Sequence, residues 1–144
     1  MHFRHPRPGH SIWGLSCLLA MLACGGGGRY IVVGTAKAPS TSGIIEVDEL
    51  DGGSRLVTIH MEHLHPPDRL EEAYDRYVVW FEEPNSGKAL RAGELTYNPD
   101  NRTGDLSETS PMPAFTIKIT AEKKDNSGDS PHGLLVASQR ISAE

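Results

Sequence analysis

Three histidines in the middle of the chain have the types and spacing that come closest to a metal site. His60, His63 and His65 lie within six residues of one another, with Glu62 among them. Neutral imidazole nitrogens suit zinc, copper and nickel ions. In an extended strand His63 and His65 would point to one face and His60 to the other, because side chains alternate. The spacing therefore predicts two ligands on one face, His63 and His65.

A third ligand for such a site has to come from another part of the chain. Glu72, Asp75 and His132 are the side chains of suitable type that could supply it. The alternative is that the histidines are polar residues on the solvent side of a strand end, an arrangement that needs no cofactor. We adopt this interpretation and expect no cofactor, with metal binding by His63 and His65 kept as an alternative.

Residues for nucleophilic or acid–base catalysis form no recognised pattern. The sequence has no Gly-x-Ser-x-Gly, the turn that exposes a catalytic serine in many hydrolases. Three pairs of carboxylates are direct neighbours: Asp48/Glu49, Glu71/Glu72 and Glu82/Glu83. Neighbouring side chains diverge in a strand, so such pairs are typical of solvated faces. We therefore predict that the protein is not an enzyme.

One cysteine has a sequence context that gives it a chemical role. Residues 1–10 carry Arg4 and Arg7 and no acidic side chain, and residues 11–23 are almost wholly apolar. Cys24 follows Met-Leu-Ala and precedes four glycines. A basic head, a short apolar run and small residues before a cleavage point are typical of a secretory signal.

The position of Cys24 resembles the bacterial lipobox, although Met21 stands where that motif usually has leucine. The resemblance implies that Cys24 becomes the first mature residue and carries a diacylglyceryl thioether and an N-acyl group such as palmitate. The apolar run is roughly 12 residues long, whereas a helix that spans a bilayer needs about 20. An uncut membrane anchor is the alternative, and the glycines argue against it because they disfavour a helix.

These features divide the chain and locate it. We expect a signal peptide in residues 1–23, the lipid-attachment cysteine with a glycine tether in 24–29, and one folded domain in 30–144. The protein should then be held in the bacterial envelope by its lipid, facing the periplasm or the cell surface. A protein partner in the envelope is possible on this interpretation.

The composition limits the partners and the chemistry of the exported part. Removing residues 1–23 takes away two of 14 basic side chains and none of 19 acidic ones, which leaves 121 residues with a net charge of about −7. Such a surface disfavours nucleic acid, which binds clustered Lys and Arg. Cys17 leaves with the signal, so the folded domain holds no cysteine for a disulfide or a thiol site.

The exported part reads as a series of short strands. Apolar and polar residues alternate, and Pro, Gly, Asn and Asp mark the turns between them. The predicted strands cover residues 30–33, 44–47, 56–61, 77–81, 89–97, 103–109, 115–121 and 134–138. This pattern predicts an all-β, antiparallel, immunoglobulin-like sandwich of seven to eight strands. Residues 51–54 should form a hairpin turn, residues 68–75 at most one helical turn, and Trp80 should be buried between the two sheets.

Five short motifs follow one another between residues 56 and 138. They are a Leu-His-Pro-Pro turn at 64–67, Tyr-x-x-Trp at 77–80, a hairpin around Gly87 and Gly93, Thr-x-Glu at 120–122, and a Pro/Gly segment at 131–136. In this order they resemble the C-terminal, extracytoplasmic domain of anti-sigma-K factors, and the chain is also similar to small bacterial lipoproteins. The resemblance implies the sandwich fold and brings no catalytic residue with it.

The resemblance does not extend to the region ahead of the module. Anti-sigma-K factors carry a cytoplasmic sigma-binding domain and a membrane span there, whereas this chain has its 23-residue signal. We therefore expect a non-enzymatic interaction or structural module anchored in the envelope. A metal-binding envelope protein, and an accessory or sensory module related to anti-sigma outer domains, are the alternatives.

Overall fold

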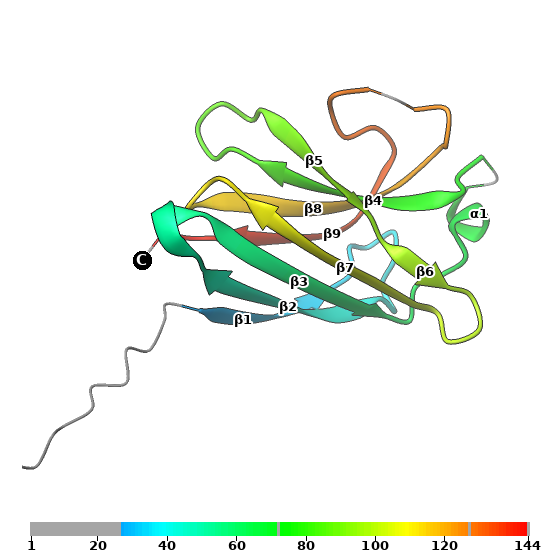
Figure 1. Cartoon of the computed structure of the whole chain (residues 1–144). Helices are drawn as coiled ribbons and strands as arrows, with labels where there is room; N and C mark the ends of the chain where they lie inside the picture. Colours follow the sequence, from blue (N-terminus) through cyan, green and yellow to red (C-terminus); the bar gives the residue numbers. More distant parts are fainter. Residues whose placement is uncertain (1–26, 72, 127, 144) are drawn as a thin grey trace, which may run out of the picture.

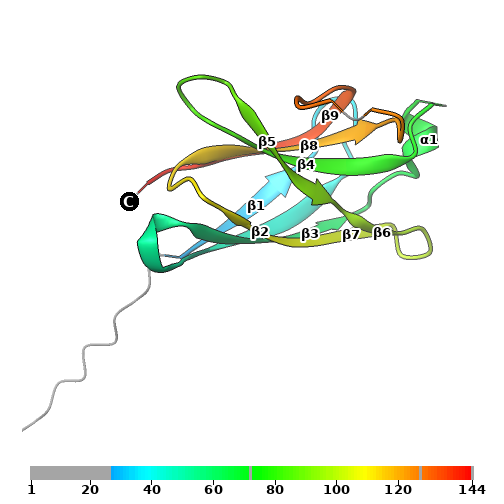
Figure 2. The same cartoon turned by 45° about the horizontal axis from the view of Figure 1, so that its top comes forward.

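The structure, a computed structural model, describes residues 27–71, 73–126 and 128–143, and strands dominate them (Figure 1). Two sheets lie face to face, as Figure 2 also shows. All neighbouring strands run antiparallel. The predicted all-β antiparallel sandwich is confirmed. The predicted signal peptide and Cys24 lie outside the described residues.

The first sheet has the strand order β1-β2-β3-β7-β6 and the second has the order β5-β4-β8-β9. The strands of the first sheet are Gly28–Val33 (β1), Ser42–Glu49 (β2), Arg55–Glu62 (β3), Thr103–Ser110 (β7) and Thr96–Asn98 (β6). Those of the second are Ala89–Glu94 (β5), Arg76–Glu82 (β4), Phe115–Glu122 (β8) and Leu134–Ile141 (β9).

The order of the strands is that of an immunoglobulin domain with two additions. The segment β2-β3-β7-β6 corresponds to strands A-B-E-D, and β4-β8-β9 corresponds to C-F-G, of a constant-type domain. β5 adds a strand beside β4, and β1 adds one beside β2. The extra strand β1 is the first element after the predicted lipid-attachment cysteine.

Alternation explains why the strands bury one face. In β3, Val57, Ile59 and Met61 are buried, whereas Thr58 is exposed. β4 and β8 supply the facing side of the core, where the ring centroids of Phe81 and Phe115 lie 5.0 Å apart. Apolar side chains from both sheets thus form one core between the layers.

One predicted strand is divided between the two sheets. Residues 89–97 were expected to form a single hairpin partner, but β5 pairs with β4 and β6 pairs with β7. The change takes place at Leu95, which is buried in the core and donates its backbone N–H to Tyr77 O at 3.0 Å. The described residues therefore form nine strands, where seven to eight were predicted.

Short turns connect most of the strands. The predicted hairpin turn at residues 51–54 is present as the 3-10 turn η1 (Asp51–Gly53), in which Gly52 and Gly53 both have a φ of 83°. Only glycine adopts this backbone conformation at little cost. The predicted helical turn is α1, Pro67–Leu70. Within the described ranges, no helix combines the length and apolar character needed to cross a membrane.

Candidate functional site

His63 and His65 lie just beyond the end of β3. The strand ends at Glu62, and His63 has a backbone φ of 55°, in the left-handed region. The extended strand assumed through His65 is therefore wrong, and the alternation that was to place both rings on one face does not apply. The rings bind separate hydroxyls: His63 Nδ1 lies 3.4 Å from Ser42 Oγ, and His65 Nε2 lies 2.9 Å from Ser40 Oγ.

An arginine occupies the position next to these histidines. Arg102 Nη2 donates to His63 O at 3.2 Å and to His65 Nδ1 at 3.4 Å, while its Nε donates to Leu64 O at 3.0 Å. Because a guanidinium group has only donors, His65 Nδ1 must be the acceptor and Nε2 carries the proton. Both ring nitrogens of His65 are thus engaged, and the guanidinium charge repels a metal cation at this position.

The three residues expected to complete a metal site are placed elsewhere or not described. Asp75 N donates to Glu122 O at 3.1 Å, and His132 N donates to the Glu122 carboxylate at 3.2 Å, so both belong to the surroundings of Glu122. Glu72 lies outside the described residues. In residues 27–71, 73–126 and 128–143, no three His, Cys, Asp or Glu side chains are grouped so that they could hold a metal ion.

His60 is the histidine that lies within a strand, on the outer face of the first sheet. Its Nδ1 donates to Asp105 Oδ1 at 2.6 Å, and its Nε2 lies 3.6 Å from Glu62 Oε1. The hydrogen bond to Asp105 raises the pKa of His60 above its ordinary value, with burial opposing this and the charges of Asp105 and Glu62 adding to it. The two carboxylates lie beside opposite nitrogens of the ring. The contact between His60 and Asp105 joins β3 to β7, whereas Glu62 belongs to the same strand as His60.

The outer face of the first sheet changes character from one edge to the other. Strand pairing places Ile31, Ile44, His60, Asp105 and Thr96 in one row across its five strands. The row is apolar at β1 and β2 and polar at β3, β7 and β6. Ile31 is 81% exposed, which makes the β1 end of this face a candidate for protein contact.

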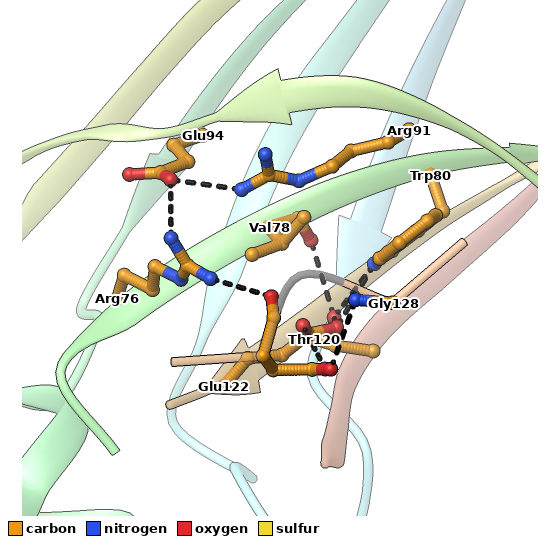
Figure 3. A network of polar contacts seen from close by, with 9 residues as sticks. Arg76, Val78, Trp80, Arg91, Glu94, Thr120, Glu122 and Gly128 are labelled. Atoms are coloured by element: carbon orange, nitrogen blue, oxygen red, sulfur yellow. Dashed lines mark hydrogen bonds and ion pairs between the residues drawn. The ribbon is translucent and has the colours of Figure 1, made fainter. Parts of the chain in front are cut away.

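Trp80 is buried as predicted, but it lies on the outer face of the second sheet. Tyr77, Val79 and Phe81 occupy the core side of β4, so Trp80 must point the other way. Its Nε1 donates to Thr120 Oγ1 at 3.1 Å and to Glu122 Oε1 at 3.0 Å (Figure 3). The prediction that Trp80 packs between the two sheets is therefore wrong.

Glu122 is a buried carboxylate at the centre of this outer network. It is 1% exposed and accepts hydrogen bonds from Trp80, from Thr120 Oγ1 at 2.6 Å, from Asn126 Nδ2 at 2.9 Å and from His132 N at 3.2 Å. Several donors are needed because a buried carboxylate without them is costly. Asn126 and His132 belong to the loop between β8 and β9, so the carboxylate fastens this loop to the sheet.

Arg76 extends the network to the edge strand β5. Its Nη1 donates to Glu94 Oε1 at 2.8 Å and its Nη2 donates to Asn126 O at 2.9 Å, and Arg91 donates to the same Glu94 oxygen at 2.8 Å (Figure 3). A hollow of about 330 Å³ lies beside it, lined by Glu71, Tyr74, Lys123, Asn126, His132 and Gly133. Asn126 and His132, which line this hollow, tie the loop to Glu122.

Sequence reasoning missed this network, although one signal for it was available. Thr120 and Glu122 are two residues apart in a strand, which places them on the same face. Whether Trp80 lies on that same face follows only from the pairing of β4 with β8. In this pairing Val78 is opposite Thr120 and Trp80 is opposite Lys118. Pairing of this kind is a tertiary property.

Comparisons with family models, curated proteins and solved structures gave no match for this chain. The resemblance to the outer domain of anti-sigma-K factors stays a prediction that rests on the order of the five motifs.

Proposed function

We propose that this protein is a lipid-anchored component of the bacterial envelope whose single sandwich domain is a non-enzymatic interaction or structural module. The basic head, the apolar run and the small residues before Cys24 support the anchor. Acyl chains add roughly 0.8 kcal/mol of membrane affinity for each buried CH₂, and more than one chain is needed for stable attachment. A diacylglyceryl group together with an N-acyl group meets that requirement.

The observation that carries the proposal is the short link between the proposed lipid and the strand β1. Only three residues lie between Cys24 and Gly28, where β1 begins. The four Cα-to-Cα steps from residue 24 to residue 28 span at most about 14 Å, so an acyl group on Cys24 would hold β1 at the membrane surface. β1 also presents the most exposed large apolar side chains in the described part of the chain, Ile31 at 81% and Val33 at 71%.

The anchor is tested by expressing the full chain in a bacterium with an alkyne analogue of palmitate. We expect wild type to take up the label and to fractionate with membranes, and Cys24→Ser to lose both properties. Cys17→Ser is the matched control, because Cys17 lies in the segment predicted to be removed. Identical labelling and fractionation of wild type and Cys24→Ser would overturn the anchor.

A further inference from the structure

The four edge strands of the sandwich differ in how their free sides are protected. Natural proteins protect sheet edges with short strands, proline, charges and β-bulges, because an open edge can pair with another chain. β6 has only three residues and is followed by Pro99. In β5, Val79 pairs with Gly93 and Trp80 pairs with Arg91, which leaves Ala92 as a bulge in this edge strand.

The edge strand β9 is protected in two ways. Ile119 pairs with Ala137 and Thr120 pairs with Leu135, so Val136 is a bulge. The segment that follows β1 also covers β9: Thr35 N donates to Val136 O at 2.8 Å and Thr35 Oγ1 donates to Leu135 O at 2.7 Å. Two carbonyls near the start of this strand are therefore already satisfied.

β1 is the least protected of the four edge strands. All six of its residues pair with β2 in one uninterrupted register, and among the described residues no strand pairs with its other side. It contains no proline, and its one charged residue, Arg29, lies 3.7 Å from Glu46 of the neighbouring strand. Its outward apolar side chains are Ile31 and Val33, which are 81% and 71% exposed. This combination is typical of an edge that pairs with a partner strand.

We propose that the occupant of this edge is β1 of a second copy of the chain, paired antiparallel about a twofold axis. This deepens the proposed interaction function by naming its partner. Residues opposite each other in a sheet must share a face. An antiparallel pair centred on Ile31 meets this condition, because Ile31 then faces Ile31 of the other copy and Arg29 faces Val33. The inward residues Tyr30 and Val32 face each other in the same way and extend both cores.

The proposed lipid favours a second copy over other occupants. In an antiparallel pair the two Gly28 residues lie at opposite ends of a six-residue ribbon, so both tethers reach the membrane when the ribbon lies parallel to it. Confinement to one surface raises the effective concentration of identical chains. An isologous contact of this kind gives a closed dimer, because the same edge of each copy forms the contact.

The test is disulfide trapping of the full chain in intact membranes under mild oxidation. We expect Ile31→Cys to give at least about fivefold more disulfide-linked dimer than Leu90→Cys, since opposed Cβ atoms in a strand pair lie near disulfide distance. Leu90 is the matched control, because it is an apolar residue with 47% exposure on the protected edge β5. The wild-type chain controls for Cys17 and Cys24.

The register is tested with two differently tagged chains in the same cell. Arg29→Cys and Val33→Cys should cross-link to each other more than either does to itself. Equal yields for Ile31→Cys and Leu90→Cys, or a link from position 31 only to a different protein, would overturn the self-pairing. The two proposals can fail independently. Ile31→Cys dimers on a protein that is not attached to the membrane would reject the lipid and keep the pairing. Palmitate-labelled protein without dimers would keep the lipid and reject the pairing.

Discussion

Trp80 donates its indole N–H to Glu122 across 3.0 Å on the outer face of the second sheet, and both side chains are 1% exposed. A buried tryptophan and a buried carboxylate thus lie outside the core between the sheets. Asn126 and His132 of the loop between β8 and β9 donate hydrogen bonds to the same carboxylate. We interpret this pair as the fastening point of that loop.

Replacing Glu122 should therefore destabilise the folded domain. Glu122→Ala leaves the buried Trp80 N–H without its carboxylate acceptor, and we expect a loss of about 3 kcal/mol in the free energy of unfolding. Urea unfolding measures this loss. Glu82→Ala is the control, because the Glu82–Lys118 ion pair on the same sheet is partly exposed and should contribute less than about 1 kcal/mol. Equal losses in the two variants would contradict the fastening role.

A close approach between β2 and β3 should make Gly43 intolerant of any side chain. A Cβ at Gly43 would meet His60 O at 2.5 Å and also the Met61 sulfur, whereas a Cβ at Gly93 meets Leu106 Cδ1 at 3.2 Å. Backbone cannot give way as a leucine methyl can, so Gly43→Ala should cost about 2–3 kcal/mol. Gly93→Ala should change stability by less than about 1 kcal/mol. Thermal unfolding of both variants checks this, and similar melting temperatures would argue against the close contact.

The His60–Asp105 pair should make stability depend on pH in a defined direction. The pKa of His60 is raised in the folded state, chiefly by its hydrogen bond to Asp105. Its contribution is therefore fully present below the unfolded-state pKa and is lost as the pH rises through the folded-state pKa. Asp105→Asn should destabilise the domain more at about pH 5.5 than at about pH 8.5, by less than about 1 kcal/mol because the pair is exposed.

An NMR titration of the His60 ring measures the same effect directly. Its pKa should fall in Asp105→Asn and stay at the wild-type value in Asp100→Asn, which removes a carboxylate from an exposed turn. A pKa that responds equally to both substitutions would mean that net charge, and not the contact with Asp105, raises it.

The fold was largely predictable because most strands alternate and end in clear turn residues. The sequence pattern failed to predict the division of residues 89–97 between the two sheets. Leu95 is apolar and would face the core in either sheet, so the neighbouring residues do not indicate that the hydrogen-bonding partner changes there. It also failed for Trp80. Residues 77–81 are all buried, so this run has no alternation to show which side chains face the other sheet.

The candidate site was harder to predict because its geometry depends on distant residues. The left-handed backbone of His63 goes together with hydrogen bonds from Arg102, almost 40 positions later in the chain. The Glu122 network needs the pairing of β4 with β8 and the path of the following loop. Cys24 is the opposite case, because its proposed role depends only on the residues around it.

The most direct measurement of the proposed anchor is the mass of the N-terminal peptide of the protein purified from bacterial membranes. We predict a peptide that begins at Cys24, extends through the four glycines to Arg29, and carries a diacylglyceryl thioether and an N-acyl group. A chain that begins at Met1, or a Cys24 without lipid, would contradict the proposal that this domain is held at the membrane by its first mature residue.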